Sequence, residues 1–169
     1  MRYTSVAAAL GLTLLSLHTS LAGQKPEPQV DARSVALLER GKAARAAGNP
    51  SAANDLIETA LVVDPRNRGA YLTLAEIARA QGLHGKAIRF YREALTLQPT
   101  DLAALKGQGE AMVAKGAVLR AKENLAKIRQ LCSEQCTEGA QLSAVIAKGP
   151  PPQVAAAVAA DVPKKVGEN

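Results

Sequence analysis

Small and apolar residues recur along this chain with a fixed period of 34 residues. One copy of the pattern is matched in the next, residue for residue: Gly48, Ala53, Ala60 and Pro65 by Gly82, Ala87, Ala94 and Pro99. A third, weaker copy follows in Gly116, Ala121 and Ile128. A period of this length is typical of stacked helical hairpins, so the pattern predicts an all-α solenoid. Such a stack offers a surface for binding other chains and has no catalytic site built into its repeat.

The middle unit shows how each period divides into two helices. Apolar residues of its first helix are spaced i, i+3, i+4 and i+7: Tyr71, Leu74, Ala75 and Ala78. Those of its second helix are spaced i, i+4 and i+7: Ala87, Tyr91 and Ala94. Both spacings place the residues on one helix face. Gly82 stands where the chain must reverse, and Pro99 ends the second helix because proline interrupts helical hydrogen bonding.

These residues resemble a tetratricopeptide repeat. The signature positions of that family are occupied by Tyr71, Leu74, Ala75, Gly82, Ala87, Tyr91, Ala94 and Pro99. Ala78 departs from the pattern, because an aromatic residue is usual there. The flanking units match less well, with Arg40 and Ala44 departing in the first and Gln108, Ile128 and Ser133 in the third. The resemblance spans residues 34–133 and implies a right-handed solenoid of three hairpins that binds a protein or peptide partner.

The first residues of the chain are expected to act as a secretory signal. Arg2 supplies a positive charge, residues 6–17 are almost entirely apolar, and Ser20-Leu21-Ala22 offers small residues before a cleavage point at Gly23. A membrane anchor is the alternative, but a dozen apolar residues fall short of the roughly 20 that span a bilayer. Gln24 stands where a lipoprotein would carry its cysteine. We therefore predict a periplasmic or secreted protein without stable membrane insertion after cleavage.

Composition and local patterns divide the rest of the chain into segments. Leu142, Val145 and Ile146 lie on one helix face and predict a helix that caps the last repeat. The tail is rich in Pro, Ala and Val, and we expect it to be flexible, with a short helix over 153–160 as the alternative. The expected segments are a signal peptide at 1–22, an extended leader at 23–31, a repeat domain at 32–148 and a tail at 149–169. Within the repeat domain, we expect repeats at 34–67, 68–101 and 102–133 and a capping helix at 137–148.

The resemblance also implies a concave groove lined by the first helix of each unit. By position, its lining is Val35, Leu38, Lys42, Arg45, Leu72, Glu76, Arg79, Lys106, Glu110 and Val113. Cations outnumber acids in this set, which favours an extended peptide or a chain end bearing carboxylates. A solvated helix face is the alternative. The family's best-known peptide clamp does not carry over, because Leu38, Thr73, Ala103 and Gly107 stand at its positions.

Cys132 and Cys136 are the only cysteines, and in an exported protein we expect them to form a disulfide that holds the turn before the capping helix. A thiol redox role is the first alternative, but Cys132 lies at a helix C-terminus, where the dipole disfavours a thiolate. Metal binding is the second. It lacks ligands, since His84 is the one histidine after the signal and a closed zinc site needs four ligands.

Charge and motif content exclude further classes of function. The chain carries 21 Lys and Arg against 15 Asp and Glu, with acids and bases mixed, and it has three tyrosines, one phenylalanine and no tryptophan. Such a chain has neither the basic arm nor the stacking rings of a nucleic-acid binder. No catalytic triad, metalloprotease motif or nucleotide loop is present, so we expect neither an enzyme nor a cofactor. Self-association into a structural scaffold remains the alternative to partner binding.

Overall fold

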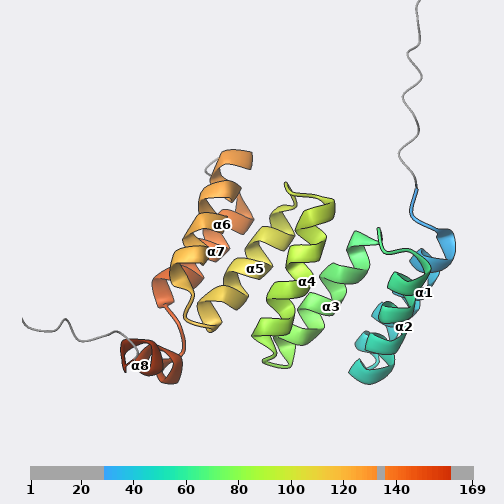
Figure 1. Cartoon of the computed structure of the whole chain (residues 1–169), viewed down its shortest axis with the longest axis horizontal. Coiled ribbons are helices and arrows are strands. Elements are labelled where there is room, and N and C mark those ends of the chain that lie inside the picture. The colour runs from blue at the N-terminus through green and yellow to red at the C-terminus, as the bar shows by residue number, and fades with distance from the viewer. Residues whose placement is uncertain (1–28, 133–135, 161–169) are drawn as a thin grey trace, which may run out of the picture.

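The computed structural model describes residues 29–132 and 136–160, and throughout these ranges the regular structure is helical (Figure 1). The elements are α1 (Ala32–Ala46), α2 (Pro50–Val63), α3 (Arg68–Ala80), α4 (His84–Leu97), α5 (Leu102–Ala114), α6 (Val118–Leu131), α7 (Thr137–Lys148) and α8 (Pro152–Ala160). The expected signal peptide and most of the expected leader lie outside the described residues. No helix in the described part of the chain is both long and apolar enough to cross a membrane.

Three helical hairpins stand side by side in chain order (Figure 1). Helices α1 and α2, α3 and α4, and α5 and α6 pack most extensively as pairs, and α2–α3 and α4–α5 contacts join each pair to the next. Helix α7 packs on both α5 and α6, as the first helix of a further pair would. The prediction of an all-α solenoid of three hairpins with a C-terminal capping helix is confirmed.

Polar side chains begin the first helix of every hairpin. Asp31, Asn67 and Asp101 are the N-cap residues of α1, α3 and α5, and each side chain accepts a hydrogen bond from a backbone N–H in the first turn. Asn49 does the same for α2, directly before Pro50. Such caps satisfy backbone donors that the helix leaves free, and each contributes about 1 kcal/mol.

Glycine ends the first helix of every hairpin. Gly48, Gly82 and Gly116 have φ values of +77°, +73° and +79°, in the left-handed region that residues with a Cβ rarely adopt. Their 34-residue spacing therefore records the same tight reversal three times. This backbone requirement explains why glycine is the most regular part of the sequence pattern.

The core follows the same period. In the described ranges nine alanines have no exposed surface: Ala53, Ala60, Ala70, Ala75, Ala87, Ala94, Ala104, Ala111 and Ala121. Larger side chains fill the space beside them, among them Ile57, Tyr91 and Leu125, all of which are buried. Close approach of backbones at the alanines lets these side chains bridge from one helix to the next.

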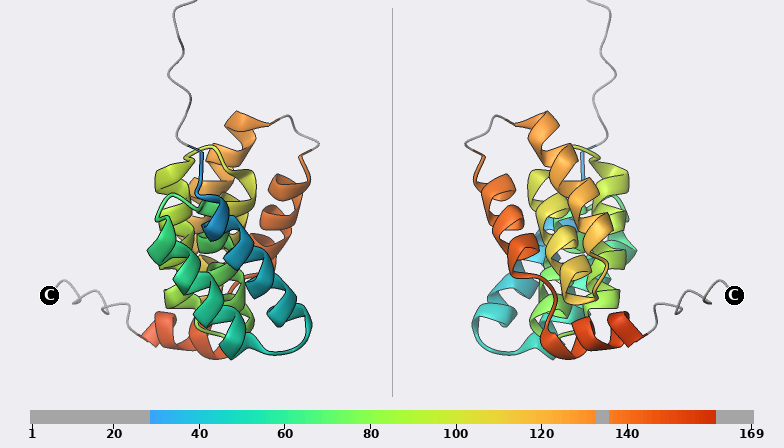
Figure 2. Two further views of the ribbon diagram at one scale, coloured as in Figure 1. Left: turned by 90° about the vertical axis from the view of Figure 1, so that its right-hand side faces the viewer. Right: turned by 90° about the vertical axis from the view of Figure 1, so that its left-hand side faces the viewer.

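The structure differs from the sequence expectation in the tail. Residues 152–160 form helix α8, the alternative that the alanine content had left open. Figure 2 shows α8 running crosswise below the solenoid instead of alongside α7. It lies on the α5–α6 turn, where a Cβ added to Gly116 would come within 2.8 Å of Val158 Cγ2 and 3.1 Å of Val154 Cγ1. Alanine favours the helix, and Val154 and Val158, four residues apart, supply a small apolar stripe.

Candidate functional site

The face formed by the first helices α1, α3 and α5, called here the inner face, carries charged residues in register. Arg45 and Arg79 stand in the last turns of α1 and α3, where the helix dipole favours a cation. Glu76 and Glu110 lie on α3 and α5, one period apart. The repeat thus places an arginine of one hairpin opposite a glutamate of the next.

These residues form two equivalent inter-repeat ion pairs. Arg45 Nη1 lies 2.6 Å from Glu76 Oε2, and Arg79 Nη1 lies 2.6 Å from Glu110 Oε2. The arginine side chains keep about two-fifths of their surface exposed, at 39% and 41%. Glu76 is 47% exposed as well, so the Arg45–Glu76 pair contributes only about 0–1 kcal/mol, whereas Glu110 is 14% exposed. The two pairs therefore hold the guanidinium groups in place on the surface without removing them from solvent.

The remaining predicted lining residues divide into exposed and buried ones. Lys42 Nζ lies 2.8 Å from Glu39 Oε1 on its own helix. Lys106 Nζ donates to Gln141 Oε1 on α7 at 2.8 Å. Leu72 is half-buried against the core, and Val35 is exposed whereas Val113 is buried. The cations of the predicted set and Glu76 are thus accessible on α1, α3 and α5, whereas Glu110 is largely buried.

Leu38 does not belong to an accessible groove surface. Only 5% of it is exposed, and it packs in the core with Ile57 and Leu74. A Cβ added to Gly69 at the start of α3 would lie 2.9 Å from Leu38 Cδ2. The assignment of Leu38 to the groove is therefore wrong in this respect, because a glycine on the next repeat admits its side chain between α1 and α3.

The residues predicted for repeat packing lie in the second hairpin and at its edges. Leu74, Ala75, Ala87, Tyr91 and Ala94 are buried. Tyr71 is half-buried against the cluster that contains Tyr91. Gly82 makes the turn described above, and Pro99 follows the C-cap of α4.

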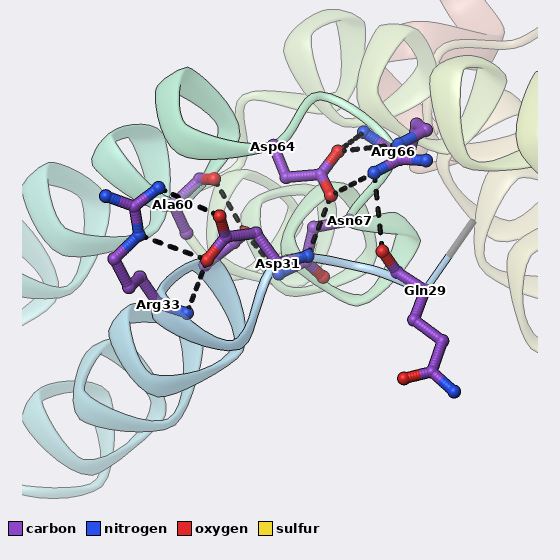
Figure 3. Close-up of polar contacts among 8 residues, drawn as sticks. Gln29, Asp31, Arg33, Ala60, Asp64, Arg66 and Asn67 are labelled. Carbon is purple, nitrogen blue, oxygen red and sulfur yellow. Dashed lines mark hydrogen bonds and ion pairs between the residues drawn. The ribbon is translucent and has the colours of Figure 1, made fainter.

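A second set of polar contacts ties the N-terminal ends of α1 and α3 together (Figure 3). The backbone N–H of Asp31 donates to Asp64 Oδ2 at 2.9 Å. Asn67 Nδ2 donates to Ser34 Oγ at 2.8 Å, and Ser34 Oγ donates to the Ala60 carbonyl at 2.7 Å. These bonds lie at the end of the inner helices opposite to the Arg45–Glu76 pair, so neighbouring inner helices are held at both ends.

Asp64 is the charged centre of this set. Arg66 donates to it through Nε at 3.0 Å and Nη2 at 2.9 Å, and the same Nη2 reaches the Gln29 carbonyl at 3.3 Å. The Arg66 side chain, followed by the backbone N–H groups of Asp31 and Arg66, holds the pKa of Asp64 well below its ordinary value. Asp64 is therefore ionised throughout the neutral and mildly acidic range.

At the second contact between inner helices, an ion pair replaces this arrangement. Arg68, the first residue of α3, pairs with Asp101, the N-cap residue of α5. Sequence reasoning missed both sets. The sequence spacing does contain a signal for these contacts. Asp31 and Asp64, like Arg68 and Asp101, are 33 residues apart, and the two arginine–glutamate pairs join residues 31 apart, slightly less than one period.

Cys132 and Cys136 form a disulfide, with Cα atoms 5.9 Å apart. They are the C-cap residue of α6 and the N-cap residue of α7, so the bond joins the last repeat to the capping helix. His84 is the first residue of α4, and its Nδ1 is buried without a hydrogen-bond partner in the described ranges. Among residues 29–132 and 136–160, no group of three His, Cys, Asp or Glu side chains is arranged to hold a metal ion.

Comparison with known proteins agrees with this architecture. Residues 38–101 match the sequence model of the tetratricopeptide repeat family. The Sgt2 TPR domain from Aspergillus fumigatus superposes with a TM-score of 0.63 at 24% identity, covering 82% of this chain and 91% of that domain. The first TPR of Spaghetti (RPAP3), bound to an HSP90 peptide, gives 0.64 at 20% identity, covering 72% and 97%. The Yersinia enterocolitica type III secretion chaperone SycD, in complex with a peptide of the translocator YopD, gives 0.58 at 17%, covering 75% and 92%.

No curated protein sequence is significantly similar to this chain. Stacked helical hairpins with a charged inner face define a class of helical-repeat solenoids. Within that class, residues 38–101 match the tetratricopeptide repeat family, and the described chain shares the fold of solved tetratricopeptide repeat domains.

Proposed function

We propose that this protein is an exported adaptor that binds a protein or peptide partner through its inner face, in envelope assembly or secretion. The fold supports the binding role, since two of the structurally similar proteins, RPAP3 and SycD, hold peptides in their structures. The apolar stretch and small residues before Gly23 support export. The adaptor would act by holding its partner and would supply no chemistry of its own.

The observation that carries the proposal is the pair of repeated, exposed arginines. Arg45 and Arg79 are one period apart and are held by Glu76 and Glu110 at 2.6 Å. Because the Arg45–Glu76 pair is exposed on both sides and contributes little to stability, a carboxylate on a partner can replace Glu76 at small cost. Arginine binds carboxylates through two parallel hydrogen bonds, which fixes the direction of the bound group. Two such sites at the spacing of a repeat suit an extended acidic segment.

Charge reversal at both arginines tests this role. We expect Arg45→Glu/Arg79→Glu to lose partner capture after brief cross-linking in the native compartment, while its thermal unfolding shifts only slightly. Arg89→Glu is the matched control, because Arg89 is exposed on α4, outside the inner face. A partner captured equally by all three proteins would place the binding surface elsewhere.

Export is tested separately. The intact mass of protein recovered from a periplasmic or secreted fraction should correspond to a chain that starts at Gly23. Recovery only of the chain that keeps Met1, or only from the cytoplasmic fraction, would contradict export without affecting the binding test.

A further inference from the structure

An open depression of about 280 Å³ lies between α4 and α6, with α5 residues among its lining. Three cationic side chains line it, Arg92 from α4 and Arg120 and Lys127 from α6, together with one acid, Glu123. Across residues 29–132 and 136–160, none of the three cations takes part in a salt bridge. The depression therefore carries an excess of two positive charges on helices that lie outside the inner face.

The preceding contact between repeats shows what the same positions do elsewhere in the molecule. One period earlier, Glu58 and Lys86 stand at the positions of Arg92 and Arg120. Glu58 Oε1 and Lys86 Nζ lie 3.8 Å apart and form an ion pair between α2 and α4. At the contact between α4 and α6 the acid of this pair is replaced by arginine. Two cations are left at positions that elsewhere hold opposite charges, and Glu123, the acid at the depression, forms no salt bridge with either of them in the described ranges.

The floor of the depression differs from the preceding contact in a matching way. Phe90 packs against the core of the first contact, and one period later its position is taken by the much smaller Asn124. Asn124 Nδ2 donates to the Leu105 carbonyl and to Gln108 Oε1, both at 3.0 Å. Gln108 Nε2 in turn donates to the Ile88 carbonyl at 3.3 Å. Hydrogen-bonded amides thus form a polar floor beneath the open depression.

We propose that this depression binds an oxyanion, a carboxylate or a phosphate group, between Arg92 and Arg120. The bound group would take the place of the acid that completes the ion pair at the preceding contact. Guanidinium groups bind both kinds of oxyanion through paired hydrogen bonds, and Lys127 adds a third positive charge. The site lies on the α4 and α6 side of the solenoid, so a ligand there leaves Arg45 and Arg79 free for a partner.

Titration calorimetry of the purified protein at low ionic strength tests the site, with inorganic phosphate and glutarate as probes. We expect saturable binding that Arg92→Glu weakens by about tenfold to a hundredfold, because it restores the ion pair of the preceding contact and removes a charged hydrogen-bond donor. Lys122→Glu makes the same change in charge at an exposed position of α6 outside the depression, and should bind within about twofold of the wild type. Absence of saturable binding, or equal weakening in the two variants, would overturn the proposal.

A second variant tests the floor independently of charge. Gln108→Leu/Asn124→Phe transfers the apolar filling of the preceding contact to this one and should also weaken binding, with helical content by circular dichroism as the check on folding. A folded double variant that binds phosphate and glutarate as the wild type does would contradict the site. Tighter binding of glutarate identifies a carboxylate as the natural group, and tighter binding of phosphate identifies a phosphoryl group.

Discussion

Leu142 is the side chain through which the capping helix docks on the third repeat. It has no exposed surface and packs with Leu105, Leu125 and Ile128. Its approach to α5 depends on Gly109, since a Cβ there would lie 2.7 Å from Leu142 Cδ2. Leu142→Ala removes three carbon atoms from a closed cluster to which α5, α6 and α7 all contribute.

The cost follows from burial and from the position of α7 at the end of the solenoid. Fully buried Leu→Ala substitutions cost about 3 to 5 kcal/mol, and less where the surroundings can collapse. Because α7 has neighbours on one side only, it can shift toward α5, so we expect a loss of about 3 kcal/mol. For a helical domain of this size that corresponds to a fall in melting temperature of about 12 °C.

Thermal and urea unfolding followed by circular dichroism at 222 nm measures this loss. Leu119→Ala is the control, because it makes the same chemical change on α6 at a side chain that is 76% exposed. It should change the free energy of unfolding by less than about 0.5 kcal/mol. Equal effects of the two substitutions, or a loss below about 1 kcal/mol for Leu142→Ala, would refute the docking role assigned to this side chain.

Three further predictions concern the turns, the charged network and the disulfide. Gly82→Ala should destabilise the protein by about 1–2 kcal/mol, because the φ of Gly82, +73°, is left-handed. Gly85 lies in helix α4 with open space around it, so Gly85→Ala should stabilise the protein by about 0.5–1 kcal/mol. The opposite order of melting temperatures would be inconsistent with the turn geometry. Asp64→Asn should reduce the free energy of unfolding at neutral pH. The difference from the wild type should shrink as the pH falls below about 4, because the fold lowers the pKa of Asp64 and the stabilisation is lost when its carboxylate is protonated. A difference that does not vary with pH in urea unfolding would contradict this. Cys132→Ala/Cys136→Ala should cost about 2 kcal/mol or less in urea unfolding, since the closed loop is short; a larger loss would show that the bond also holds native packing.

The repeated features of the fold were predictable from the sequence because backbone geometry demands them. A left-handed turn needs glycine, a close helix crossing needs alanine, and the chain has both at a period of 34. The capping helix was visible in the spacing of Leu142, Val145 and Ile146, and α7 spans the predicted residues 137–148. Each of these signals is local, so no partner had to be known.

Features that depend on two repeats at once were not predictable in the same way. The position of Leu38 is decided by a missing Cβ at Gly69, on a different helix. The sequence pattern places Arg45 and Glu76 on the same face, but it does not say that they pair between neighbouring hairpins, as they do in the structure. Helix α8 has little periodicity of its own, and Gly116 on another element supplies its contact. Each of these features depends on side-chain contacts between different helices. The spacing of residues within one helix does not predict such contacts.

The two-point attachment of neighbouring inner helices has a mechanical consequence. Helices α1 and α3 are joined near their N-termini by the bonds around Asp64 and, more than two helical turns away, by the exposed Arg45–Glu76 pair. Salt screens the exposed pair far more than the buried carboxylate. We therefore expect rising ionic strength to weaken the Arg45–Glu76 end of the α1–α3 contact more than the end at Asp64. The angle between α1 and α3 should then vary more easily at high salt, and with it the curvature of this part of the solenoid.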